Sequence, residues 1–100
     1  MTVRTLAMEP MRHLDEPHVS QVPVIPADAS PALHEGLRRR RVAATLGRCP
    51  CGATRPAMTA IQHASAEQGG TVWRPFPHTA DCPAHDDPLG AALAAWQNRK

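Results

Sequence analysis

Two short stretches, RCPCGA at residues 48–53 and HTADCPAH at residues 78–85, contain all three cysteines of this 100-residue chain. In the first stretch, Cys49 and Cys51 are separated by a proline and followed by a glycine. Two thiolates on one zinc ion lie only about 3.8 Å apart, because each Zn–S bond is about 2.3 Å long. The proline fixes one φ angle and the glycine relieves crowding at the bend. The first stretch therefore predicts half of a zinc site.

The second stretch supplies the remaining ligands. The simplest Cys₃His set consists of Cys49, Cys51, His78 and Cys82. Residues 52–77, between the two halves, leave room for one helix and one strand. His85 is an alternative to His78, because it follows Cys82 at the spacing of a turn that presents two ligands. His78 is preferred, because it lies at the end of a predicted strand, a rigid point from which a side chain can be aimed.

Other uses of the same residues stay open at this point. Without a metal, the cysteines and the histidine are ordinary small or polar residues. A disulfide can join Cys49 to Cys51, or it can involve Cys82 over a longer range. Cys82 can also serve as a nucleophile with His78 or His85 as its base, although nothing in the sequence orients that pair.

Ligand chemistry separates a structural zinc from a catalytic one. A catalytic zinc keeps an open position beside a carboxylate base, a role available to Asp81 or Asp86 in a metal-dependent hydrolase. Three thiolates donate enough charge to weaken the ion as a Lewis acid. The deaminase pattern H-x-E…P-C-x-x-C and a Gly-rich phosphate loop are both absent from the sequence. We therefore expect a closed structural site and a protein that is not an enzyme.

These motifs also carry a resemblance. CPCG is one residue shorter than the CPxCG knuckle of zinc ribbons and treble clefs. The pattern CPCGA…H…CPA, within residues 47–85, resembles small and mostly uncharacterised proteins of actinobacteria and their phages. The order Cys51, His78, Cys82, His85 resembles the ligand order of zinc-binding anti-sigma factors, a distant cysteine before H-x3-C-x2-C, with His85 in place of the last cysteine. Both resemblances imply metal binding, and neither implies an enzymatic activity.

The composition indicates a small core. The chain has 11 prolines, and Leu, Ile, Val and Phe together account for 16 of its residues. A domain with so few large apolar residues usually needs a disulfide, a metal or a partner chain for stability. The sequence shows neither a secretory signal nor an apolar stretch of about 18 residues that would span a membrane. We therefore expect a cytoplasmic protein without a membrane partner, in a compartment where closely spaced Cys and His indicate metal binding or redox chemistry.

The patterns predict a small, zinc-stabilised α+β domain of zinc-knuckle or treble-clef type, with two to three helices and a short strand. Residues 1–30 are rich in proline and show no sustained helical or strand periodicity. They are expected to form a flexible, disordered arm, and residues 31–100 are expected to form the zinc-binding domain.

Three helices and one strand are expected after the arm. The first helix follows Ser30 as its N-cap and ends at Gly47. A second, alanine-rich helix lies within residues 55–70, and TVWRPF at residues 71–76 is a short edge strand. The last helix has Asp87 as its N-cap, and one of its faces carries Leu89, Leu93 and Trp96.

Positive charge gathers around the first helix and the first cysteine pair. Residues 31–60 contain six arginines and one glutamate, a net charge of +5. Clustered arginines suit contacts with phosphate groups, whereas three aromatic residues in the whole chain give little surface for base stacking. We therefore expect a zinc module that binds a polyanion, either nucleic acid or ribonucleoprotein, through Arg38, Arg39, Arg40, Arg41 and Arg48.

A second functional hypothesis is a regulator that docks on a protein, for instance the transcription machinery, through its helices. Oxidation of the thiolates would then release the zinc. The histidines outside the two cysteine stretches are isolated in the sequence and are expected to be solvated at the surface: His13, His18, His34 and His63.

Overall fold

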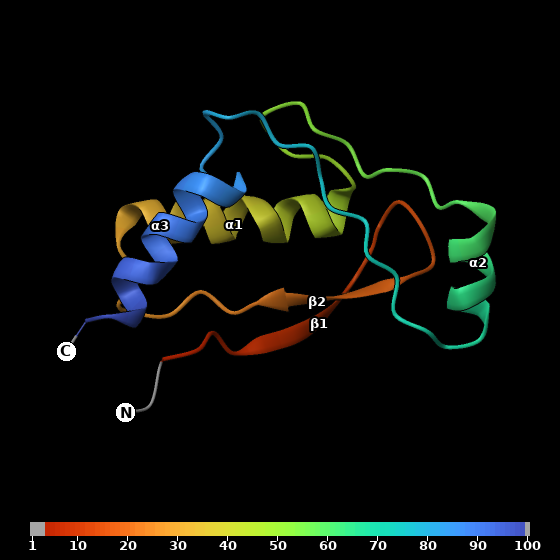
Figure 1. The fold of residues 1–100 in the computed structure, drawn as a ribbon, viewed down its shortest axis with the longest axis horizontal. Helices are drawn as coiled ribbons and strands as arrows, with labels where there is room; N and C mark the ends of the chain where they lie inside the picture. The colour runs from red at the N-terminus through yellow and green to blue at the C-terminus, as the bar shows by residue number, and fades with distance from the viewer. Residues whose placement is uncertain (1–3, 100) are drawn as a thin grey trace.

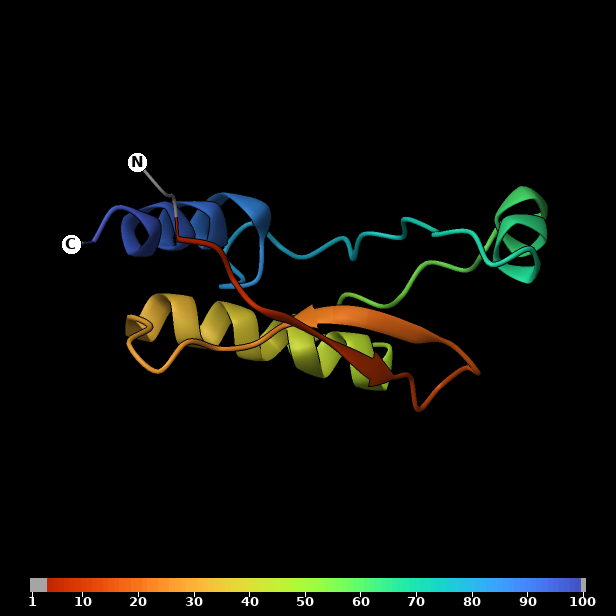
Figure 2. The ribbon, with the colours of Figure 1, turned by 90° about the horizontal axis from the view of Figure 1, so that it is seen from below.

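A computed structural model describes residues 4–99, which form a hairpin and three helices (Figure 1). The elements are β1 (Met8–Arg12), β2 (Val19–Pro23), α1 (Pro31–Leu46), α2 (Ala60–Glu67) and α3 (Asp86–Gln97). Helix α1 contacts both the hairpin and α3, whereas α2 stands away from the other helices (Figures 1 and 2). The predicted α+β class is confirmed. None of the helices in the described part of the chain is long and apolar enough to cross a membrane.

Helix α1 begins and ends where the sequence predicts. The Ser30 hydroxyl accepts the N–H of Leu33 at 3.2 Å, and Pro31 occupies the first turn. Gly47 ends the helix in the left-handed region at a φ of 79°, and its N–H donates to the Ala43 carbonyl. A proline at the start and a left-handed glycine at the end are the local signals that fix such a helix.

One of the two clusters of the core lies between α1 and α3. Its buried members are Leu33, Leu37, Leu89 and Trp96. The two helices come close at Gly36, where an added Cβ would lie 2.5 Å from the Pro83 carbonyl oxygen and 2.7 Å from Leu89 Cδ1. Helix α3 presents the predicted apolar face, although its N-cap is His85 and not Asp87.

The hairpin is where the structure differs most from the sequence prediction. Instead of a flexible arm, β1 and β2 pair antiparallel, with Met8 opposite Pro23 and Arg12 opposite Val19. The hairpin packs on α1, and its Val22 side chain is 2% exposed. The hairpin therefore belongs to the same folded unit as the helices. Residues 1–3 of the predicted arm lie outside the described residues.

The register explains why prolines do not prevent this pairing. His13 donates its N–H to the His18 carbonyl and Val24 donates to the Ala7 carbonyl, which fixes the hydrogen-bonded positions of the ladder. Because these positions alternate along an antiparallel pair, Pro10 of β1 and Pro23 of β2 fall at positions that do not donate across it. Their missing N–H groups therefore cost the sheet no hydrogen bond.

The segment between the two halves of the cysteine pattern also departs from the prediction. We call residues 56–77 the α2 loop. The predicted strand at residues 71–76 is absent, because the extended chain there has no strand beside it to pair with. Helix α2 is shorter than predicted, starts with a Thr59–Gln62 capping box, and buries none of its residues.

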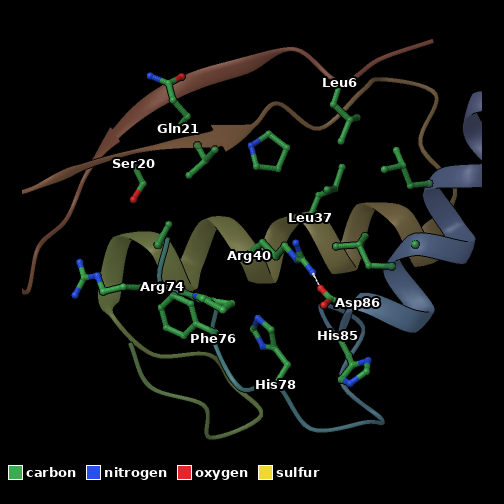
Figure 3. Close-up of a pocket in the computed structure, with 18 of the residues that line it drawn as sticks. Leu6, Ser20, Gln21, Leu37, Arg40, Arg74, Phe76, His78, His85 and Asp86 are labelled. Atoms are coloured by element: carbon green, nitrogen blue, oxygen red, sulfur yellow. Dashed lines mark hydrogen bonds and ion pairs between the residues drawn. The ribbon is translucent and has the colours of Figure 1, made fainter. Parts of the chain in front are cut away.

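A cavity of about 640 Å³ lies between the hairpin, α1, the end of the α2 loop and the start of α3 (Figure 3). Leu37 of α1 and Leu89 of α3 contribute to its apolar wall. Arg40, His78 and His85 lie on the side away from the hairpin (Figure 3). Ser20 and Gln21 line the hairpin side (Figure 3), so the cavity combines apolar wall residues with polar side chains on two sides.

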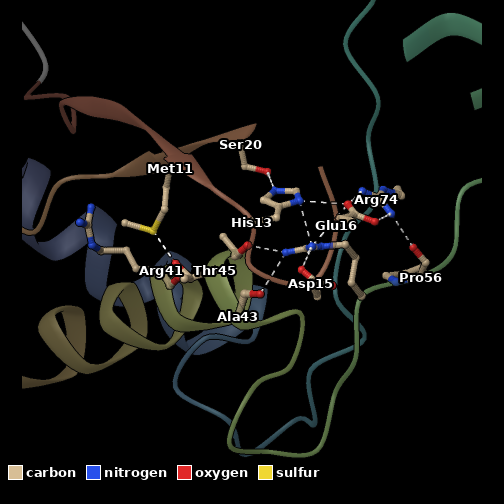
Figure 4. A network of polar contacts seen from close by, with 12 residues as sticks. Met11, His13, Asp15, Glu16, Ser20, Arg41, Ala43, Thr45, Pro56 and Arg74 are labelled. Atoms are coloured by element: carbon tan, nitrogen blue, oxygen red, sulfur yellow. Dashed lines mark hydrogen bonds and ion pairs between the residues drawn. The ribbon is translucent and has the colours of Figure 1, made fainter. Parts of the chain in front are cut away.

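A polar network ties the hairpin turn to the base of the α2 loop (Figure 4). The His13 side chain, predicted to be solvated, is buried, so that prediction is wrong. Its Nδ1 lies 3.0 Å from Glu16 Oε1, and its Nε2 lies 2.5 Å from Ser20 Oγ. Desolvation lowers the pKa of His13, and the nearby Arg55 guanidinium acts in the same direction.

Two arginines complete this network. Arg74, from the α2 loop, forms an ion pair with Glu16 and donates to the Pro56 carbonyl at 3.0 Å. The hydrogen bond from Arg74 lowers the pKa of Glu16 to about 2. Arg55 forms an ion pair with Asp15 at 2.7 Å and also donates to the carbonyls at the end of α1. The hairpin turn therefore holds both ends of the α2 loop in place.

Candidate metal centre

The structure brings together the four residues predicted as ligands, Cys49, Cys51, His78 and Cys82. Their ligand atoms all lie within 4.8 Å of one another. Cys49 Sγ lies 3.7 Å from Cys82 Sγ, and His78 Nδ1 lies 3.6 Å from Cys51 Sγ and 3.9 Å from Cys82 Sγ. These separations match the edges of a tetrahedron around zinc, about 3.8 Å between sulfurs and about 3.6 Å between sulfur and nitrogen.

The first ligand pair lies in a tight turn directly after α1. An isolated bridge between Arg48 and Thr54 closes the turn. Within it, Cys49 donates its N–H to the Ala53 carbonyl at 2.8 Å, and Gly52 donates to the Cys49 carbonyl at 2.9 Å. Gly52 has a φ of 99°, a conformation that favours glycine over every other residue. This backbone presents two sulfurs to one point, as a zinc knuckle requires.

The second ligand pair follows the extended end of the α2 loop. The His78 ring stacks on Phe76, with 5.8 Å between ring centroids. The chain then turns, and Cys82 donates its N–H to the Thr79 carbonyl at 3.0 Å. A stacked aromatic ring and a short turn therefore aim these ligands, in place of the predicted end of a strand.

His85, the alternative fourth ligand, lies outside the cluster. Its Nδ1 accepts the N–H of Asp87 at 3.1 Å and so caps α3. A side chain used as an N-cap is held at the helix end, away from the thiolates. His78 therefore lies beside the other ligands, whereas His85 is the N-cap of α3.

The environments of two thiols differ. Burial raises the pKa of the Cys49 thiol to about 11. Burial acts in the same direction on Cys51, but there hydrogen bonds from the backbone of Thr79 and Ala53 and from the His78 ring prevail and lower the pKa to about 5. Metal binding would therefore have to release a proton from Cys49 at neutral pH, whereas the lowered pKa of Cys51 favours its thiolate.

Arg39 of α1 reaches the cluster from outside. Its Nη1 lies 3.8 Å from Cys82 Sγ, and its Nε donates to Glu35 Oε1 at 2.8 Å. The backbone N–H of Ala84 also donates to Cys82 Sγ, at 3.4 Å. Three thiolates around a divalent ion leave one excess negative charge, and these donors offset it. The contact joins residues 43 positions apart, so no sequence pattern predicts it.

The arginines predicted to contact nucleic acid are used mostly inside the fold. Arg38 pairs with Glu35 at 2.7 Å. Arg40 donates to the Ala84 carbonyl and to Asp86, and Arg41 donates to the Pro23 carbonyl and pairs with Glu9. Arg48 is exposed, and among the described residues no ion pair involves it. The five arginines therefore do not form one open basic face.

Comparison with known proteins adds nothing to this description. A scan against protein-family models gives no match, and searches of the curated proteins and of the solved structures give none. The resemblance to small actinobacterial and phage proteins accordingly stays a prediction.

Proposed function

We propose that this chain is a non-enzymatic module in which the Cys₃His cluster binds a structural zinc ion. The observation that carries the proposal is the set of four ligand atoms within 4.8 Å of one another, three of whose separations, 3.6 to 3.9 Å, suit a tetrahedral zinc ion. Two of the ligands, Cys49 and Cys82, are buried, and the other two are half-buried. Four protein ligands leave no position for substrate or water, which is the arrangement of structural zinc sites.

The packing around the cluster supports a stabilising role. Its buried neighbours are alanines: Ala43, Ala53 and Ala84. Alanine buries little apolar area, and area removed from water stabilises by only about 25 cal/mol per Å². The cluster also joins the end of α1 to the turn before α3, with the α2 loop between them. A bound ion would therefore supply stability at the point where the apolar core is weakest.

Metal stoichiometry and cobalt spectroscopy test this proposal. We expect one zinc per chain by elemental analysis of purified protein. Cobalt substitution should give the absorption of a tetrahedral ion with thiolate ligands, insensitive to added anions. Cys82→Ser should lose that spectrum, whereas His85→Ala should keep it. A spectrum that shifts with added azide would reveal an open position and favour a hydrolase.

We further propose that the module acts by binding a partner protein through the α2 loop. Ile61 is 83% exposed and Trp73 is 79% exposed, although both are large apolar residues. An isolated helix as short as α2 is unstable in water without tertiary packing. These two side chains would therefore bury the most apolar surface on contact with a partner. Site-specific photo-crosslinking from position 73, with position 18 as a control, tests this surface.

A polyanionic partner is the second candidate, because two of the arginines remain accessible. Arg48 is exposed, and the Arg38 side chain is 45% exposed although it pairs with Glu35. The test is the affinity for a DNA duplex and an RNA hairpin as a function of salt. A steep loss of affinity with salt, reduced in an Arg38→Gln/Arg48→Gln variant, would support phosphate contacts. Failure to bind either probe at low salt would remove this candidate.

A further inference from the structure

The cavity beside the metal centre has the size and lining of a small-molecule site. Its volume of about 640 Å³ falls within the range of about 300–1,000 Å³ that such sites occupy. Side chains from the hairpin segment, α1, α3 and the α2 loop make the wall largely apolar: Leu6, Val22, Leu37, Phe76, Leu89 and Leu93. Polar side chains line the cavity on two sides: Ser20 and Gln21 on the hairpin, and His78, His85 and Asp86 on the second ligand stretch and the start of α3 (Figure 3).

The two histidines that line the cavity can offer only donors to a ligand. The Nδ1 of His78 faces the thiolates, so a metal bound there leaves the ring proton on Nε2. The Nδ1 of His85 accepts the N–H of Asp87, which also places the proton of the neutral ring on Nε2. Each ring therefore keeps one polar group for a ligand, an N–H donor.

Arg40 adds a positive charge to the same side of the cavity. Its Nε donates to the Ala84 carbonyl at 3.0 Å, which fixes the guanidinium, and its second nitrogen pairs with Asp86 at 2.6 Å. The Asp86 side chain is 91% exposed, so water screens this pair strongly. A carboxylate that arrives inside the cavity can therefore replace Asp86 on Arg40 at little cost.

From these contacts we infer that the cavity binds a small amphipathic carboxylate. The apolar chain lies against the leucines, and the carboxylate accepts from Arg40 with the histidine N–H groups beside it. A neutral ligand would make no charge-assisted hydrogen bond to Arg40, and a cation would meet the Arg40 guanidinium as well as Asp86. The role of His78 rests on the proposed zinc site, because its tautomer follows from metal binding at Nδ1.

Calorimetric titration of the full zinc-loaded chain with decanoate, and with decanol as the neutral control, tests the inference. We expect saturable 1:1 binding of decanoate and at least tenfold weaker binding of decanol. Arg40→Gln should weaken decanoate binding about tenfold, because a charge-assisted hydrogen bond is lost. Asp86→Asn should strengthen it by up to about fivefold, because a competing carboxylate is removed. Neither variant should change the affinity for decanol.

The opposite effects of the two variants separate ligand binding from damage to the fold. Equal affinities for decanoate and decanol, or the same direction of change in both variants, would overturn the inference. Zinc content measured on the same samples separates this result from the zinc proposal. Fully zinc-loaded protein that does not bind decanoate overturns the ligand site alone. Zinc-free protein that binds decanoate with unchanged affinity supports the ligand site and contradicts the role of zinc.

Discussion

Replacing Arg39 with glutamine should weaken zinc binding about tenfold. The Arg39 side chain is 25% exposed and lies 3.8 Å from Cys82 Sγ. Opposite charges about 4 Å apart attract by about 4 kcal/mol at an effective dielectric constant of 20. Much of this attraction is offset by desolvation and by the ion pair with Glu35, so we expect the variant to lose about 1.4 kcal/mol of zinc-binding free energy. That corresponds to the lower end of the tenfold to hundredfold losses typical of residues that support metal ligands.

The assay is competition with a chromophoric chelator at pH 7, which gives the zinc affinity and the rate of release. Arg38→Gln is the matched control, because Arg38 binds the same glutamate at 2.9 and 2.7 Å and makes no contact with a thiolate. We expect Arg38→Gln to stay within twofold of the parent protein and Arg39→Lys to recover most of the affinity. Equal losses in the two glutamine variants would refute the reasoning, because a general weakening of α1 would then suffice.

Three further predictions concern packing, exposure and protonation. Gly36→Ala should lower the free energy of unfolding of the zinc-loaded chain in urea by about 1–3 kcal/mol, because the added Cβ would meet the Pro83 backbone. Gly90→Ala should raise it by about 0.5–1 kcal/mol, because nothing lies within 4 Å of the added Cβ and alanine favours the helix. Trp96→Ala should lower the free energy of unfolding in the same assay by about 3–5 kcal/mol, and Trp73→Ala should lower it by less than about 0.5 kcal/mol. Similar losses for the two variants would contradict the exposed position of the α2 loop. Since burial raises the pKa of Cys49 to about 11, zinc affinity should rise at least about tenfold per pH unit between pH 6 and 8, and a flat profile would contradict this.

Local signals in the sequence were sufficient for the ends of α1 and for the cluster of Cys49, Cys51, His78 and Cys82. Ser30, Pro31 and Gly47 fix the ends of α1 through interactions within a few residues. The spacing of the cysteines and His78 restricts the metal site because two ligands in one turn must face the same point. Such constraints act between residues close together in the chain, so the spacing of residue types in the sequence indicates them.

The features that the sequence did not predict depend on distant contacts. The hairpin tolerates its prolines because they lie at positions that do not donate across the ladder, and this depends on the register. The predicted strand at residues 71–76 fails because strand formation needs a partner. The roles of His13 and Arg39 depend on groups from other elements, Arg55 and Cys82 respectively. No periodicity or spacing in the sequence indicates these contacts.

Zinc at the Cys₃His cluster is expected to hold the fold together. Thermal unfolding of the purified chain, followed by circular dichroism before and after chelation with zinc content measured in parallel, tests it most directly. We expect one zinc per chain, a cooperative transition when zinc is bound, and loss of that transition after chelation, with recovery when zinc is restored. A metal-free chain that unfolds cooperatively at the same temperature would contradict it.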